Sequence, residues 1–183
     1  MEPLFKGTGV IGYRNYIDSK FGMGFFDQKM KEIDPKWNSQ VIPSSWYNAQ
    51  NMVKAICNIY DPVNDKRKIL EMGEILLEND LNGVYKFFMK LGGPQKVLAF
   101  IPQLATAYTN YIKVIILENK VGYIKAENVV PNEMAEYTAL STESALKGTI
   151  KACGFQSTFT LLSNEQTLNG NGTTRSLIYE CRY

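Results

Sequence analysis

The sequence predicts an α+β fold in which N-terminal helices pack with a C-terminal four-stranded antiparallel sheet. Over residues 1–111, apolar side chains recur at spacings of three and four, which is the period of an amphipathic helix. Over residues 112–183, short β-rich runs flank one further helix, in the order β-β-α-β-β. A length of 183 residues fits one domain. We therefore expect a single domain, 1–183, with a helical part (1–111) and an antiparallel sheet with an inserted helix (112–183).

Up to six helices are expected in the first part. They cover residues 13–20, 25–33, 48–60, 64–80, 84–91 and 94–108. Asp34 and Pro35 are expected to end the second of them. Asn48 is a suitable N-cap for the third, because its side-chain oxygen can accept a hydrogen bond from the first helical turn. Pro94 suits the first turn of the last helix, and Pro102 is expected to kink it.

Four strands and one helix are expected in the second part. The strands are predicted at 113–118, at 121–130, at 155–162 and around 177–181, and the helix over 132–153. Asn119 and Lys120 would form the turn of the first hairpin, and the Asn-Gly-Asn-Gly run of 169–172 that of the second. Gly154 would end the helix.

The composition excludes several kinds of chemistry. The chain has no histidine, which excludes histidine-based catalytic triads, histidine-ligated zinc and histidine-ligated haem. Twenty basic and 18 acidic residues give a net charge of +2, and the densest basic cluster, residues 66–68, has acidic neighbours. The chain is therefore not expected to bind nucleic acid.

The three cysteines favour a reduced, cytoplasmic protein. Cys57, Cys153 and Cys181 are far apart in the sequence, and none lies in a Cys-x-x-Cys motif. No metal site is expected, because two thiolates do not complete a four-ligand zinc site. No apolar run approaches the roughly 20 residues that span a bilayer, and the N-terminal residues do not resemble a signal peptide.

Gly7, Gly9 and Gly12 match the spacing of the dinucleotide-binding fingerprint. That fingerprint should follow a buried strand and open the helix of a βαβ unit, whereas only six residues precede it here and helical patterns follow. The favoured interpretation is an extended N-terminal segment that turns into the first helix.

A stripe of small side chains runs along one face of the helix predicted at 132–153. Its members are Thr138, Ser141, Ala145, Gly148 and Ala152. Such a stripe permits close packing of the helix on the sheet, or it leaves room for a ligand. Tyr13, Tyr16, Tyr108 and Tyr111 form a second group of interest, because buried phenols seek hydrogen-bond partners and can orient a ligand.

Trp46 and Tyr47 follow Pro43 and two serines. The aromatic pair would anchor the next helix to the core or line a pocket. If a ligand pocket exists, the residues expected to line it are Trp46, Tyr47, Tyr108, Ser141, Ala145 and Gly148.

Three segments resemble a family of uncharacterised proteins abundant in myxobacteria and related bacteria. They are Lys6-Gly7-Thr8-Gly9, Pro43-Ser44-Ser45-Trp46-Tyr47 and Tyr85-Lys86-Phe87-Phe88-Met89-Lys90-Leu91-Gly92. That family is similar in layout to the haem nitric-oxide/oxygen-binding domain, to the 4-vinyl reductase sensor domain and to the Bet-three type subunits of the TRAPP vesicle-tethering complex. The resemblance implies N-terminal helices and a four-stranded antiparallel sheet with a helix between its hairpins.

The chain departs from each of these relatives at the functional residues that the resemblance implies. Haem-binding members use a proximal histidine and a Tyr-x-Ser-x-Arg motif that holds the haem propionates, and this sequence has neither. Zinc-binding members use a cysteine-rich cluster, of which only Cys153 and Cys181 could remain. Acylated TRAPP subunits use a cysteine at the mouth of an apolar tunnel; Cys57 lies on an apolar helix face, and a buried, inert thiol is the favoured interpretation.

The leading hypothesis is a non-enzymatic regulatory or sensory domain that binds a small apolar ligand, without haem, between its helices and its sheet. The alternative is a homodimeric scaffold or adaptor that acts through protein contacts, with Phe21, Phe25 and Phe26 at its interface. In either case we expect a homodimer or a signalling protein as partner. An enzyme is not expected, because no nucleophile is paired with a base and no carboxylate pair stands out.

Overall fold

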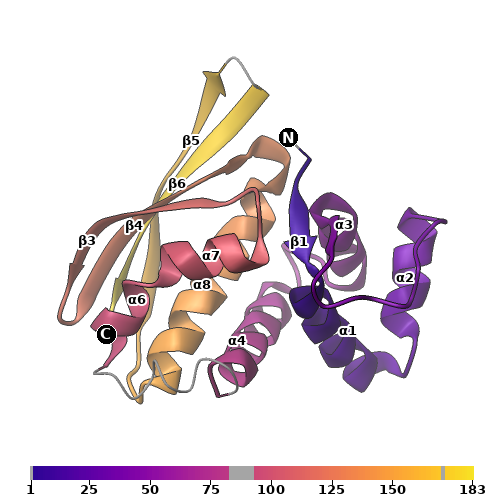
Figure 1. The fold of residues 1–183 in the computed structure, drawn as a ribbon. Coiled ribbons are helices and arrows are strands. Elements are labelled where there is room, and N and C mark those ends of the chain that lie inside the picture. The colour runs from indigo at the N-terminus through magenta and orange to yellow at the C-terminus, as the bar shows by residue number, and fades with distance from the viewer. Residues whose placement is uncertain (1, 83–92, 170–171) are drawn as a thin grey trace.

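The computed structural model describes residues 2–82, 93–169 and 172–183 (Figure 1). The N-terminal elements are β1 (Leu4–Lys6), α1 (Gly7–Phe21), α2 (Phe25–Ile33), β2 (Trp46–Asn48), α3 (Ala49–Ile59) and α4 (Lys66–Asn82). The later elements are α6 (Pro94–Leu98), α7 (Ile101–Tyr108), β3 (Lys113–Lys120), β4 (Tyr123–Pro131), a 3₁₀ turn (Asn132–Met134), α8 (Ala135–Ala152), β5 (Thr158–Asn169) and β6 (Gly172–Arg182).

The C-terminal sheet has four antiparallel strands in the order β3-β4-β6-β5. Every second side chain of β4 is buried, which is the alternation expected of a sheet with one covered face. Helix α8 lies along that face, with α6 and α7 nearby, and the β5–β6 hairpin extends beyond it (Figure 1). The predicted α+β fold with a β-β-α-β-β second part is therefore confirmed.

The first hairpin turns two residues later than predicted. Strand β3 continues to Lys120, which pairs with Tyr123, so the turn consists of Val121 and Gly122. Gly122 has φ of +77°, a left-handed conformation that glycine adopts without a steric penalty. The backbone therefore places this turn where the glycine is, rather than at Asn119 and Lys120.

The helices follow the predicted pattern with two differences, of which the first is that α1 begins at Gly7, six residues before its predicted start. Asn48 caps α3, accepting a 2.8 Å hydrogen bond from the backbone N–H of Asn51. The single kinked helix expected over 94–108 is instead two helices, α6 and α7, with Pro102 in the first turn of the second. In the first turn of a helix the backbone N–H has no partner within the helix, so proline, which lacks that N–H, loses nothing there. In a helix interior, proline would remove one hydrogen bond and its ring would clash with the preceding turn. The helix expected at 84–91 lies outside the described residues.

A second, two-stranded sheet was not predicted. Strand β1 pairs antiparallel with β2, bringing Phe5 opposite Tyr47 and Lys6 opposite Trp46. Both strands have three residues, too few for an alternating pattern to stand out in the sequence.

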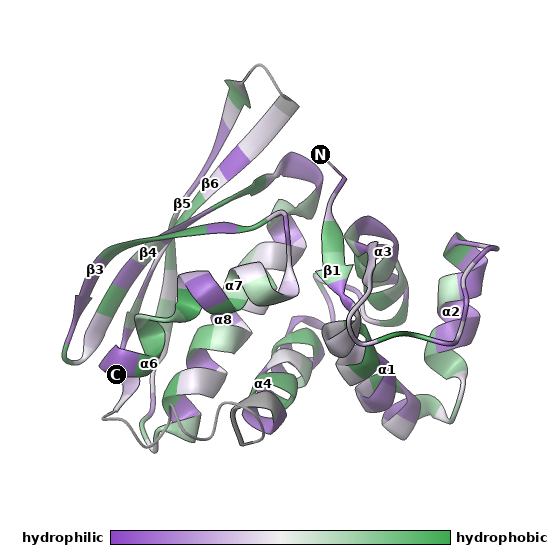
Figure 2. Ribbon diagram, in the orientation of Figure 1, coloured by the Kyte–Doolittle hydropathy of each residue, from purple (hydrophilic) through white to green (hydrophobic). Residues whose placement is uncertain are grey.

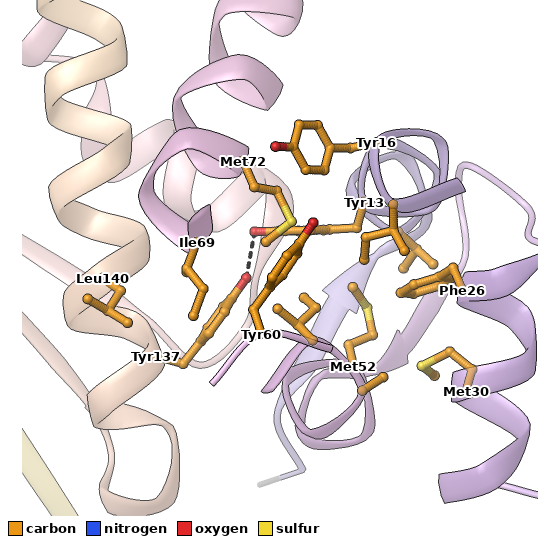
Figure 3. Close-up of a cluster of buried hydrophobic side chains, with 14 of the residues drawn as sticks. Tyr13, Tyr16, Phe26, Met30, Met52, Tyr60, Ile69, Met72, Tyr137 and Leu140 are labelled. Carbon is orange, nitrogen blue, oxygen red and sulfur yellow. Dashed lines mark hydrogen bonds between the residues drawn. The ribbon is translucent and has the colours of Figure 1, made fainter. Parts of the chain in front are cut away.

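Two hydrophobic cores flank α4 and α8. One joins α1, α2, α3 and α4 through residues such as Val10, Ile17, Phe26, Met52 and Met72 (Figure 3). The other lies between α8 and the sheet and contains Leu98, Ile124, Leu146, Ile150 and Tyr179. Figure 2 shows hydrophilic residues at the turn end of β3 and hydrophobic residues before them.

The interface expected from the three phenylalanines needs a correction. Phe26 is completely buried and contacts Trp37 in the first core, so it cannot contact another protein. Phe21 is 46% exposed and stacks on Phe25 at 4.9 Å between ring centroids. A short helix such as α2 has few apolar residues, and the sequence alone does not show which of two adjacent phenylalanines faces inward. Within the described ranges, no helix has the length and apolar character that crossing a bilayer requires.

Candidate functional site

A cavity of about 650 Å³ lies between the helical part and the sheet part. Helices α1 and α4 form one wall, α7 and α8 form the other, and β3, β4 and β6 contribute residues from the sheet. The aliphatic lining residues include Ile11, Ile75, Leu76, Leu77, Ile101, Leu104, Ile112, Val114 and Leu146. Its size is in the range of pockets that bind small molecules.

The cavity is uncharged. Among the described residues that line it there is no Asp, Glu, Lys, Arg or Cys. Polar lining residues that are exposed to solvent, Asn15, Ser19 and Asn79, mark where the cavity opens between α1 and α4. An ion moved from water into such a site would lose its hydration without gaining a counter-ion, so the lining suits a neutral molecule.

The glycines of the apparent dinucleotide motif have packing roles. They lie in the first two turns of α1, which begins at Gly7 and not at Tyr13 as predicted; only Leu4–Lys6, before the glycines, is extended. A Cβ on Gly7 would collide with the carbonyl oxygen of Ile42, and one on Gly9 would collide with the ring of Phe5. Gly9 and Gly12 also line the cavity. The motif therefore lets α1 approach its neighbours and leaves space at the cavity wall.

The stripe of small residues on α8 is divided between the cavity wall and close packing against α4. Ser141 and Ala145 line the cavity, as predicted. Gly148 does not: it packs against α4, and a Cβ there would lie 3.3 Å from the Cα of Glu74. Ser144 lies one turn before Gly148 on α8, and its hydroxyl would collide with a Cβ on Gly73 of α4. The close packing is thus against a helix, not against the sheet.

The predicted aromatic residues are divided between two places. Tyr108, on α7, lines the cavity. Trp46 and Tyr47 lie outside the lining, on β2. The ammonium of Lys6 lies 4.6 Å from the ring centroid of Trp46, and the hydroxyl of Tyr47 accepts a 2.7 Å hydrogen bond from the backbone N–H of Ile42. Tyr47 is half-buried and packs against the first core, which matches the anchoring role that the sequence also allowed. Trp46 is 41% exposed, so it does not anchor α3 to the core.

Sequence reasoning missed three polar residues at the sheet side of the cavity. Tyr179 donates a 3.0 Å hydrogen bond to Oδ1 of Asn128, whose Nδ2 donates a 2.7 Å hydrogen bond to Oγ1 of Thr142. Asn128 is 2% exposed and alternates with Ala126 and Val130 on the covered face of β4. The sequence did contain a signal for this site, because Asn128 is a polar residue at an inward position of the strand predicted at 121–130.

Tyrosines connect the two parts of the chain beside the cavity. The hydroxyl of Tyr137, on α8, donates a 3.0 Å hydrogen bond to the hydroxyl of Tyr13, on α1 (Figure 3). Burial, with contributions from Glu71 and Tyr60, raises the pKa of Tyr16 to about 12. Burial also raises the pKa of Tyr137 and, despite its hydrogen bond to Asn128, that of Tyr179. These phenols therefore remain protonated at neutral pH.

The cysteines show no sign of activation. Burial, assisted by Glu136 and Asp61, raises the pKa of Cys57 to about 11, and burial also raises the pKa of Cys153 and of Cys181. Over the described ranges, no group of three or more Asp, Glu or Cys side chains could hold a metal ion.

Comparison with known proteins gives a fold relationship. No protein-family model matches the chain, and no curated protein matches its sequence, so the expected bacterial family receives no support. Among solved structures, the chain is similar to H-NOX domains. A point mutant of the T. tengcongensis H-NOX protein has a TM-score of 0.72 at 13% identity, covering 97% of this chain and 96% of that chain.

Two further H-NOX structures give the same result. An oxygen-binding H-NOX domain related to soluble guanylate cyclases has a TM-score of 0.69 at 13% identity, covering 97% of this chain and 94% of that chain. The Fe(II) unliganded H-NOX protein from K. algicida has a TM-score of 0.63 at 11% identity, covering 97% of both chains. This chain has the H-NOX fold, and the layout expected from the resemblance is confirmed at that level.

The fold family implies a haem, and the described lining lacks both a histidine ligand and a cationic side chain for the propionates. Haem iron is held by histidine, cysteine, methionine or tyrosine side chains. In the part of the chain that the structure describes, only tyrosines of this set line the cavity. A tyrosine binds iron as the phenolate, and at two of the four described lining tyrosines, Tyr16 and Tyr179, burial raises the pKa and opposes that form. No described lining residue carries a positive charge to pair with the propionates.

Proposed function

We propose that this chain is a non-enzymatic sensory or regulatory domain that binds a small, uncharged, largely apolar ligand in the cavity, without histidine-ligated haem. The observation that carries the proposal is the cavity of about 650 Å³, whose described lining is apolar and free of charge. Apolar lining with a few polar groups is typical of small-molecule sites.

The position of the cavity supports a role in regulation. A bound ligand would contact α1 and α4 on one side and α7 and α8 on the other. A ligand that fits one arrangement of these helices better than another would favour that arrangement. A signalling partner that contacts both parts could then detect the bound state. The oxygen-binding H-NOX domain with the same fold is consistent with a small-ligand sensor.

Two alanines of α7 provide a matched test. Ala105 lines the cavity, whereas Ala107 is exposed on the same helix. Ala105→Leu adds three carbons to the space that a ligand would occupy, and Ala107→Leu adds the same carbons to the solvent-facing side. Co-purified small molecules would be identified by native mass spectrometry, and the melting temperature would be measured against a panel of neutral metabolites and lipids.

We expect the unmodified chain and the Ala107→Leu variant to bind at least one neutral compound and to melt at a higher temperature with it. Ala105→Leu should reduce both effects. The proposal is wrong if the purified chain carries no small molecule and no compound of the panel raises its melting temperature. It is also wrong if Ala105→Leu and Ala107→Leu bind the compound equally well.

A further inference from the structure

A chain of three neutral side chains forms the polar wall of the cavity. Tyr179 on β6 donates to Asn128 on β4, and Asn128 donates to Thr142 on α8, at 3.0 Å and 2.7 Å. All three residues line the cavity. Tyr179 is 1% exposed and Asn128 is 2% exposed, so the sheet and α8 hold both side chains in place.

Thr142 differs from the other hydroxyl residues of α8 that line the cavity. Ser141, Ser144 and Thr149 each donate a hydrogen bond to a backbone carbonyl in the preceding turn. The oxygen of Thr142 instead accepts the hydrogen bond from Asn128. Among the groups that the structure describes, its own hydroxyl hydrogen has no acceptor, and that hydrogen is the donor at the cavity end of the hydrogen-bonded chain.

We propose that the Thr142 hydroxyl donates a hydrogen bond to an acceptor oxygen of the ligand, and that the ligand is a neutral carbonyl compound with an apolar body. This inference rests on the proposed function of the cavity. A carbonyl oxygen accepts a hydrogen bond without donating one. It therefore matches the Thr142 hydroxyl, which is the donor at the cavity end of the hydrogen-bonded chain. A carboxylate would also accept, but no described lining residue balances its charge. A hydrocarbon would leave the hydroxyl hydrogen without a partner.

Three compounds of similar shape separate these classes. β-Acetonaphthone carries the carbonyl, β-ethylnaphthalene lacks it, and β-naphthoate is charged. Dissociation constants would be measured by ligand-observed NMR for the unmodified chain and for two variants. Thr142→Val keeps the side-chain volume and replaces the hydroxyl with a methyl group. Thr142→Ser keeps the hydroxyl.

The ketone should lose about 3- to 10-fold in affinity in Thr142→Val, which is the effect of one neutral hydrogen bond. The hydrocarbon should bind Thr142→Val at least as tightly as the unmodified chain, because it cannot accept a hydrogen bond from the Thr142 hydroxyl. Thr142→Ser should retain the affinity for the ketone, and the naphthoate should bind the unmodified chain most weakly of the three compounds. As a measurement that needs no variant, the carbonyl stretching frequency of the ketone should be lower when bound to the unmodified chain than in hexane.

The outcomes distinguish this inference from the proposed function. If the hydrocarbon and the ketone bind but Thr142→Val weakens neither, or weakens both equally, the cavity binds ligands and the role of Thr142 is wrong. An unshifted carbonyl frequency would lead to the same conclusion, and so would tighter binding of the naphthoate. If none of the three compounds binds, the inference of a carbonyl ligand fails, and the panel of neutral metabolites and lipids decides the proposed function separately.

Discussion

The hydroxyl of Tyr137 donates a hydrogen bond to the hydroxyl of Tyr13 across 3.0 Å, and the two residues are 124 positions apart in the sequence. Tyr137 belongs to α8, which packs on the sheet, and Tyr13 belongs to α1 of the helical part. Both side chains are buried, and Tyr13 also lines the cavity. This bond therefore links the two walls between which we place the ligand.

The first prediction is that these two hydroxyls are energetically coupled. Tyr137→Phe and Tyr13→Phe should each lower the free energy of unfolding by about 1–3 kcal/mol, because each removes the hydrogen bond between two buried hydroxyls. The double variant should lose clearly less than the sum, since the second substitution removes a hydroxyl that no longer has this partner. Urea denaturation of the four proteins measures the coupling.

Tyr123→Phe is the control for that cycle. Its hydroxyl donates to Glu180 at 3.2 Å near the surface, so its removal should change stability by about 0.5 kcal/mol or less. Strict additivity of the Tyr13 and Tyr137 substitutions would contradict the prediction.

Patterns that repeat along the chain made most of the fold predictable. Buried Leu177, Tyr179 and Cys181 alternate as the sequence indicated, and Asn48 caps α3 through its own side chain. These features depend on neighbours two to four residues away. Strand β2 was not expected, because its three residues pair with β1, 40 to 44 positions earlier in the chain, and no local pattern encodes that partner.

The cavity was less predictable because its walls come from distant segments. Ser141, Ala145 and Tyr108 were identified from a stripe of small residues and a group of tyrosines. Asn128 was missed because its role depends on strand register: Ala126 pairs with Tyr179, which places the tyrosine hydroxyl near the next inward residue of β4. Gly148 belongs to the same stripe but contacts α4 and does not line the cavity. The sequence does not show this, because it depends on where α4 crosses α8.

The crossing of α4 and α8 gives a second prediction. Gly73→Ala should destabilise the protein, because its Cβ would overlap the Cβ and hydroxyl of Ser144. Overpacking of this kind costs about 1–3 kcal/mol, of which better helix propensity offsets up to about 1. Gly12→Ala is the matched control: its Cβ would meet Leu76 at 3.4 Å, an ordinary contact, and it should stabilise the helix by about 0.5–1 kcal/mol.

Thermal and urea denaturation would compare the two alanine variants, and Gly73→Ala combined with Ser144→Gly tests the cause. Removing the Ser144 side chain should restore part of the stability that Gly73→Ala loses, although a second helical glycine costs about 1 kcal/mol. Equal responses to alanine at Gly73 and Gly12 would show that α4 and α8 do not cross closely at this point.

The third prediction concerns alkaline pH. The pKa of Cys57 rises from 9.0 to about 11 on folding, and that of Tyr16 from 10.0 to about 12. Above pH 9 the unfolded chain therefore loses protons that the folded chain retains, so the free energy of unfolding should be constant below about pH 8 and should fall between pH 9 and 12. Tyr16→Phe should flatten the upper part of this decline in urea titrations; an unchanged slope would contradict the assignment to Tyr16.

The fourth prediction is that Cys57 is unreactive in the folded protein. The thiolate is the nucleophile, and a rise of the pKa from 9.0 to about 11 lowers its fraction at pH 8 about 100-fold. Alkylation by iodoacetamide, followed peptide by peptide with mass spectrometry, should be slower by at least that factor than in the urea-unfolded chain. The rate in the folded protein should rise about tenfold per pH unit up to pH 10. A Cys57 that reacts equally fast in both states would instead indicate an accessible thiol, as the comparison with acylated TRAPP subunits would require.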